Sequence, residues 1–238
     1  MAKYHLVLLL TRSGDFDAAI RIAADFALHD KDGSDLTEAM GLAALRKPLL
    51  PSELPPLERE MVMDVGHAMC DAAARRAAVL GPDIAMLLSK YPKTPEIHFL
   101  AGTMELGGNP DQALADWKAE LQISPAHARA LASIAGEYLR RKDYPTALPY
   151  AEKAVADDPD SFVSHAVLGE VLTEGDIDLP RGIHELESAI HLTPAQPQVH
   201  FVLAAAFAKA GRKEDAARER AEFLRLNSKG DVALSNQK

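Results

Sequence analysis

Three histidines recur at nearly the same place in a repeating sequence pattern, and histidine is the commonest protein ligand for transition metals. They are His98, His165 and His200. If the helices that carry them are stacked, neighbouring histidines lie roughly 8–10 Å apart. A zinc ion holds its ligands at about 2 Å, so these three residues are too far apart to share one ion. We therefore expect three hydrogen-bonded histidines at helix interfaces and no metal site.

Other motifs that resemble metal-binding or catalytic sites have the wrong spacing. Residues 29–35, HDKDGSD, carry three aspartates as a calcium loop does, but Gly33 stands at the wrong position and Gly41 replaces the closing glutamate. His184 and His191 lack the helical spacing that places two ligands and a base on one zinc ion. The chain contains no phosphate-binding loop, nucleophile elbow, HExxH motif or paired CxxC motif. The sequence therefore predicts no catalytic residue, no cofactor and no enzyme activity.

The composition argues against several classes of partner. The 238 residues carry a formal net charge of −9, with 35 acidic and 26 lysine or arginine side chains. Nucleic acids and anionic membranes select basic surfaces, so we expect neither as a partner. The single cysteine, Cys70, cannot form an intramolecular disulfide, and its helical surroundings predict a small buried hydrophobe.

The N-terminus carries an apolar run that is too short for a secretory signal. The run Leu6–Leu10 is followed by Thr11 and Arg12 instead of a small-residue cleavage site. No stretch approaches the roughly 20 apolar residues that cross a bilayer, so we expect a soluble chain without membrane insertion. Because the first helix is expected to begin without a cap, we also expect an excised segment of a longer protein. The compartment and the oligomeric state stay open.

The elements that would position a site follow a 34-residue period between residues 97 and 159. The repeating positions are mostly small or apolar, and a proline closes each unit: Ile97, Leu100, Ala101, Met104, Ala113, Trp117 and Pro125 recur as Leu131, Ile134, Ala135, Tyr138, Ala147, Ala151 and Pro159. Such a period is typical of the tetratricopeptide repeat, and the chain resembles that family over most of its length. The resemblance implies an all-α fold, a right-handed superhelical solenoid of antiparallel helix pairs.

The expected solenoid has five parts along the chain. They are a repeat-like hairpin plus an extra helix at 1–46, a proline-rich break at 47–56, a divergent hairpin at 57–94, four clean repeats at 95–228 with the last as a cap, and a disordered tail at 229–238. In the divergent hairpin, Gly81 and Pro82 are expected to separate a long helix from a short one. The leucines of the proline-rich break are expected to pack on neighbouring helices, which disfavours a free docking ligand there.

In the resembled family, the first helix of each pair lines a concave groove that binds peptides or partner domains. Carried over position by position, this implies a partner-binding groove at His98, Glu105, Arg129, Ser133, Arg140, Glu170, Thr173 and Phe201, with Gly102, Gly136, Gln198 and Lys209 as further groove-facing positions. Some members of the family bind the C-terminal carboxylate of chaperones through clustered basic and amide side chains in the groove. Small residues occupy several of those positions here, so a chaperone adaptor of this kind is not expected. Arg129 and Arg140 are then candidate anchors for an acidic ligand, with two merely solvated arginines as the alternative.

The sequence thus predicts a non-catalytic scaffold for protein–protein interaction that binds a protein or peptide of unknown identity in the groove. Two alternatives remain. One is a repeat segment of a larger enzyme that positions the substrate, and the other is a structural oligomerisation module. Nothing in the residues identifies the ligand or the pathway.

Overall fold

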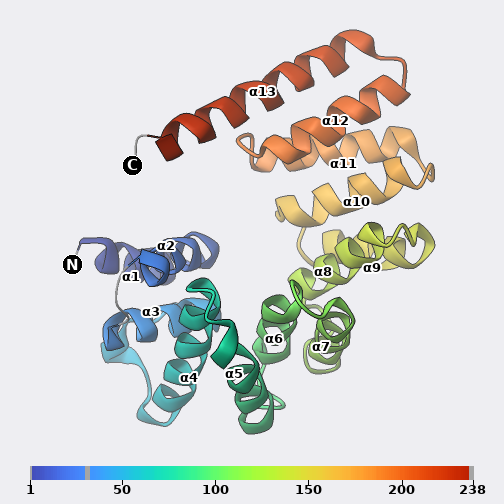
Figure 1. The fold of residues 1–238 in the computed structure, drawn as a ribbon. Helices are drawn as coiled ribbons and strands as arrows, with labels where there is room; N and C mark the ends of the chain where they lie inside the picture. Colours follow the sequence, from blue (N-terminus) through green and yellow to red (C-terminus); the bar gives the residue numbers. More distant parts are fainter. Residues whose placement is uncertain (1, 30–32, 236–238) are drawn as a thin grey trace. The chain divides into compact units, whose positions relative to one another are not determined.

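The chain is helical throughout the part that the structure describes, residues 2–29 and 33–235. In this computed structural model those residues form thirteen α-helices, one short 3-10 helix and no strand (Figure 1). The predicted all-α fold of antiparallel helix pairs is confirmed. The chain divides into two compact units, Met1–Ser124 (unit 1) and Pro125–Lys238 (unit 2). None of the described helices is both long enough and apolar enough to span a bilayer.

Unit 1 contains the less regular part of the chain. Its elements are α1 Ala2–Ser13, α2 Phe16–His29, α3 Ser34–Ala44, η1 Pro51–Glu53, α4 Pro56–Ala73, α5 Ala77–Lys90, α6 Ile97–Glu105 and α7 Pro110–Ile123. Each α-helix contacts the next one, and α4 also contacts α2. One core cluster joins the first four α-helices through buried residues such as Val7, Ala23 and Met40.

Unit 2 consists of three hairpins of similar design. Its elements are α8 Ala128–Arg140, α9 Tyr144–Asp157, α10 Phe162–Glu174, α11 Leu179–Leu192, α12 Pro197–Lys209 and α13 Lys213–Ser235. The central helix α10 contacts α8, α9, α11 and α12, so each hairpin packs on the next one (Figure 1). Within unit 2 the core is therefore a row of nearest-neighbour interfaces, as in other repeat stacks.

Side chains cap five successive helix N-termini from α7 to α11. Asn109, His127, Asp143, Ser161 and Asp178 each accept a hydrogen bond from the backbone N–H three residues later. The first N–H groups of a helix have no acceptor within the helix, so each cap fixes the residue at which that helix begins.

Small residues lie where paired helices approach closely, as the repeat pattern predicts. A Cβ atom at Gly169 would lie 2.6 Å from the Cγ atom of Leu186, and one at Gly182 would lie 2.5 Å from the Cγ2 atom of Thr173. Neither position has room for a side chain without movement of its neighbour. Trp117 is buried between α6 and α7, which confirms its predicted place in the core.

The boundary between α4 and α5 differs from the sequence prediction. α4 ends at Ala73, and Arg75 adopts a left-handed backbone conformation with a φ of 55°. Gly81 and Pro82, which were expected to separate the two helices, lie inside α5. Proline removes one hydrogen bond of the helix ladder, and α5 continues past it. The chain therefore turns at Arg75, and the prediction is wrong at this point.

The proline-rich break between α3 and α4 is tied to the rest of unit 1. The guanidinium of Arg12 on α1 donates to the Glu53 carboxylate at 2.6 Å and to the Pro48 carbonyl oxygen at 3.0 Å. Leu54 is buried. The segment is therefore anchored by hydrogen bonds and by packing, which agrees with a structural role.

The C-terminal helix is longer than the sequence predicts. α13 continues to Ser235, beyond residue 228 where the predicted capping repeat ends, and the expected disorder of residues 229–238 stays a prediction. No proline follows residue 228, and nothing there forces the helix to end. Residues 236–238 lie outside the described part, as do residues 30–32 of the predicted polar turn at 29–35.

Candidate functional site

The first helices of the three hairpins in unit 2 leave one stripe of side chains wholly or partly uncovered. We call this set the first-helix stripe: Arg129, Ser133, Gly136 and Arg140 on α8, Val163, Val167, Glu170 and Glu174 on α10, and Gln198, Phe201, Ala205 and Lys209 on α12. On each helix these positions lie three or four residues apart, which is the spacing of one helical face. Most positions between them are buried.

Apart from Phe201, the stripe continues from one hairpin to the next because the repeat keeps its register. The equivalents of Phe201 on α8 and α10, Ala132 and Ala166, are buried. Gly136, Glu170 and Ala205 occupy equivalent positions, separated by 34 and 35 residues. Since α10 contacts both α8 and α12, the three helices that carry the stripe are neighbours. Packed helices lie about 8–10 Å apart, so the stripe is wide enough for a partner segment to touch more than one helix.

Five of the eight residues predicted for the groove lie on the first-helix stripe, and their role in binding remains a prediction. They are Arg129, Ser133, Arg140, Glu170 and Phe201. Thr173 is a correction, because it is buried and its hydroxyl donates to the Gly169 carbonyl oxygen at 2.8 Å. It therefore belongs to the hairpin interior.

The other predicted groove residues belong to α6 of unit 1 and contact α7. His98 Nδ1 lies 2.9 Å from Asp116 Oδ1, and the histidine side chain is largely buried. Burial raises the pKa of Glu105 to about 7, and the neighbouring Asp116 carboxylate adds to the rise. Gly102 is buried, and a Cβ atom there would lie 2.7 Å from the indole nitrogen of Trp117. His98 and Gly102 are therefore corrected from groove positions to positions within the hairpin.

The arginine prediction also needs correction. Arg140 forms a two-pronged ion pair with Glu137, at 2.7 and 2.6 Å, and Arg141 binds the same carboxylate at 2.7 Å. These contacts hold the pKa of Glu137 below its ordinary value. Arg129 is not free either. Lys209 donates to the Thr173 carbonyl oxygen at 2.7 Å. The basic side chains of the stripe are thus already engaged within the protein.

Glu170 differs from every other residue of the first-helix stripe. Burial raises its pKa to about 7, and the nearby charge of Glu174 adds to the rise. Within residues 2–29 and 33–235 its carboxylate has no hydrogen bond or ion pair. A half-buried carboxylate without a cationic partner is costly when ionised, because burial removes part of its hydration.

Replacing Glu170 with glutamine will stabilise the fold more at pH 8 than at pH 5. The folded-state pKa of about 7 lies above the ordinary value of 4.5, so the folded chain binds more protons than the unfolded chain between these values. The wild type therefore loses stability as the pH rises through 7. We expect Glu170→Gln to gain about 1–3 kcal/mol at pH 8 relative to pH 5 in urea unfolding. An equal effect at both pH values would contradict this assignment.

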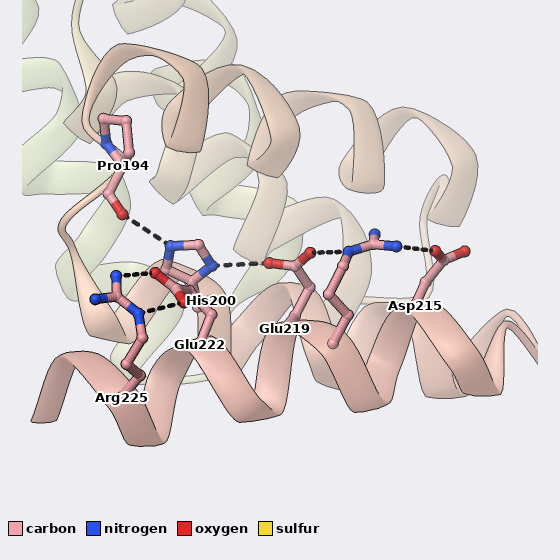
Figure 2. Close-up of polar contacts among 7 residues, drawn as sticks. Pro194, His200, Asp215, Glu219, Glu222 and Arg225 are labelled. Carbon is pink, nitrogen blue, oxygen red and sulfur yellow. Dashed lines mark hydrogen bonds and ion pairs between the residues drawn. The ribbon is translucent and has the colours of Figure 1, made fainter. Parts of the chain in front are cut away.

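Histidine–carboxylate pairs join the two helices of both later hairpins in unit 2. His165 Nδ1 lies 2.6 Å from Glu185, and His200 Nδ1 lies 2.8 Å from Glu219. Figure 2 shows the second pair, with the other ring nitrogen of His200 facing the Pro194 carbonyl oxygen at 2.9 Å. These contacts confirm that the recurring histidines are hydrogen-bonded at helix interfaces.

The first hairpin of unit 2 fills the same two positions with an apolar residue and an aromatic one. Leu131 stands where His165 and His200 stand, and Tyr150 stands where Glu185 and Glu219 stand. Leu131 is buried, and Tyr150 stacks on Tyr138 with ring centroids 6.1 Å apart. The repeat therefore accepts either a polar or an apolar pair at this register.

His200→Leu will destabilise unit 2, and adding Glu219→Tyr will restore much of the loss. The single change leaves a buried carboxylate without its imidazole partner, for which we expect a cost of about 1–3 kcal/mol. The double change copies the pair of the first hairpin. Urea unfolding of the two single variants and the double variant measures their coupling. Strictly additive effects would show that the two positions are independent.

Two hollows in unit 2 lie along the second helix α11. One has a volume of about 370 Å³ and the other about 320 Å³, and His184 and Glu187 line both. Pro159 and His191 complete the larger one, and Arg212 borders the smaller one. The pattern of the first helices in the sequence gives no signal for these two hollows.

Comparison with known proteins agrees with the repeat geometry. Residues 107–162 match the family model of the tetratricopeptide repeat. This part of the chain therefore carries the tetratricopeptide repeat. No curated protein sequence matches it significantly.

Solved structures similar to this chain include several of MamA. MamA 41-end from Desulfovibrio magneticus RS-1 has a TM-score of 0.57 and 21% identity, covering 71% of this chain and 97% of that one. MamA AMB-1 has a TM-score of 0.56 and 18% identity, covering 68% and 96%. The MamA RS-1 ArsTM double mutant has a TM-score of 0.55 and 23% identity, covering 63% and 86%. At these identities the likeness concerns the fold. Tetratricopeptide repeats support a protein-interaction scaffold in general.

Proposed function

We propose that this chain is a non-catalytic scaffold that binds a protein segment along the first-helix stripe of unit 2. The observation that carries the proposal is the continuity of the stripe over three neighbouring helices, with large apolar side chains left exposed on it. Val163 is 43% exposed and Phe201 is 51% exposed. Exposed apolar surface on a rigid helical stack favours association with another protein chain.

Phe201 is expected to be the main apolar contact for the partner. Its ring packs on Phe223 of α13 with centroids 5.3 Å apart, which holds it in place while half of it stays exposed. An aromatic side chain that is fixed before binding contributes apolar area at a low entropic cost. Fully burying such a ring contributes about 1.5–3 kcal/mol.

A phage-displayed library of random octapeptides, selected on the full chain, tests the proposal. We expect the selected peptides, measured by fluorescence polarisation, to lose about tenfold or more in affinity for Phe201→Ala, since tenfold corresponds to about 1.4 kcal/mol. Leu192→Ala on α11 is the matched control, because Leu192 is also partly exposed but lies on a second helix. Absence of any selected peptide, or equal loss in both variants, would refute binding at the stripe.

A further inference from the structure

We propose that Glu170 is the point on the first-helix stripe that binds a lysine or arginine side chain of an otherwise apolar partner segment. This inference rests on the proposed function and names the chemistry of the partner. It differs from the acidic ligand for which Arg129 and Arg140 were candidate anchors, because the glutamates of α10 are the stripe charges without an ion pair among the described residues.

The charged side chains of the stripe differ in whether they have a partner within the protein. Arg140 is bound to Glu137, Lys209 is bound to the end of α10, and Arg129 has interactions of its own. The two glutamates of α10 are different, since neither Glu170 nor Glu174 forms an ion pair within the described residues. A partner group that lies against these two glutamates is therefore expected to be positively charged.

Glu170 stands at a repeat position where the equivalent residues of the other two hairpins are small. The matching residue is glycine on α8, at Gly136, and alanine on α12, at Ala205. A Cβ atom added at Gly136 would meet nothing within 4 Å. The stack thus forms with small residues at this register, and a carboxylate is not needed to build the hairpin. Burial raises the pKa of Glu170 to about 7, so the residue costs stability when ionised.

Apolar side chains lie near Glu170 along the stripe. Val163 and Val167 precede Glu170 on the same face of α10, at a spacing of seven and three residues. Phe201 lies on the neighbouring helix α12, one helical turn before Ala205, which is the equivalent of Glu170. Apolar residues of a partner would lie over these side chains and exclude water. An ion pair formed there is screened less than one at an open surface.

Matched synthetic peptides test the inference. The apolar octapeptide that binds best in the phage selection is prepared with lysine, arginine or norleucine at each position in turn. Wild type is expected to bind the lysine or arginine form at least tenfold more tightly than the norleucine form at one position. Glu170→Gln is expected to lose that preference while it still binds the norleucine form. Glu187→Gln on α11 removes the same charge from a second helix and is expected to behave as wild type.

The possible outcomes separate this inference from the proposed function. Peptide binding that depends on Phe201 but is the same in Glu170→Gln and wild type overturns the role of Glu170 and leaves the scaffold in place. If the preference for basic residues falls equally in Glu170→Gln and Glu187→Gln, it depends only on the net charge of the protein. This result would also overturn the role of Glu170. Binding that is insensitive to Phe201→Ala overturns both proposals.

Discussion

Replacing Leu168 with alanine will lower the free energy of unfolding of unit 2 by about 2–5 kcal/mol. Leu168 is 1% exposed and packs in one cluster with Ala135, Ala151 and Leu172. Removal of its branched end leaves a cavity between the first and second hairpins of unit 2, which the neighbouring side chains fill only partly. In a stack of nearest-neighbour contacts the loss falls on the hairpins that share this cluster.

Hydrogen exchange followed by mass spectrometry locates the effect. We expect amides of α8 to α11 to lose protection in Leu168→Ala, while those of α1 to α4 keep it. Leu224→Ala is the control, because Leu224 is 61% exposed on α13 and its truncation is expected to change stability by less than about 0.5 kcal/mol. Unchanged unfolding of Leu168→Ala would show that the repeat register assigned to unit 2 is wrong.

The hairpins can be predicted from the sequence because the same physical requirement recurs in each of them. Leu100, Ile134, Leu168 and Leu203 are all nearly fully buried, and each is followed by a small residue at the helix contact. A helix pair cannot bury its apolar face alone, so the positions that meet the next pair must be apolar in every unit. The 34-residue period is the direct result of that requirement.

Helix boundaries are harder to predict, because several helices end at residues that carry no sequence signal. Arg46, Arg75 and Lys142 adopt left-handed φ values of 50°, 55° and 60°. Sequence rules look for glycine or asparagine at such positions, since long side chains rarely adopt that conformation. The chain reverses direction at Arg75. The sequence predicted that reversal at Gly81 and Pro82, about two helical turns further along the chain.

The candidate site was predictable in position but not in chemistry. Helical periodicity places Arg140, Glu170 and Phe201 on one face of the first helices, and the structure leaves all three on the stripe. Whether a charge is available depends on neighbours in space. Arg140 is held by Glu137, and Glu170 is partly buried by the stack without an ion pair among the described residues. Spacing alone therefore left Arg140 as a candidate anchor for an acidic ligand, whereas we propose a basic partner group from the contacts.

Gly66→Ala will destabilise unit 1 by about 3 kcal/mol or more, because α3 and α4 cross with their backbones in contact. A Cβ atom at Gly66 would lie 1.9 Å from the Thr37 carbonyl oxygen, and one at Gly41 would lie 1.9 Å from the Val62 carbonyl oxygen. The obstacle is the backbone of the facing helix in both cases, so no rotamer change relieves it. The helices must separate, and overpacking of this kind costs about 1–3 kcal/mol or more.

Gly136→Ala is the matched control for the crossing of α3 and α4. Gly136 lies within α8, and an added Cβ atom would meet nothing within 4 Å. Alanine is the better helix former by about 0.5–1 kcal/mol, so this variant is expected to become more stable. Thermal unfolding of Gly66→Ala, Gly41→Ala and Gly136→Ala compares one substitution at three positions. If Gly66→Ala and Gly41→Ala were stabilised as much as Gly136→Ala, the two helices could not be in backbone contact. The change in stability is expected to be negative for Gly66→Ala and Gly41→Ala and positive for Gly136→Ala. The intrinsic gain in helix propensity is the same at all three positions, and only the backbone contact differs.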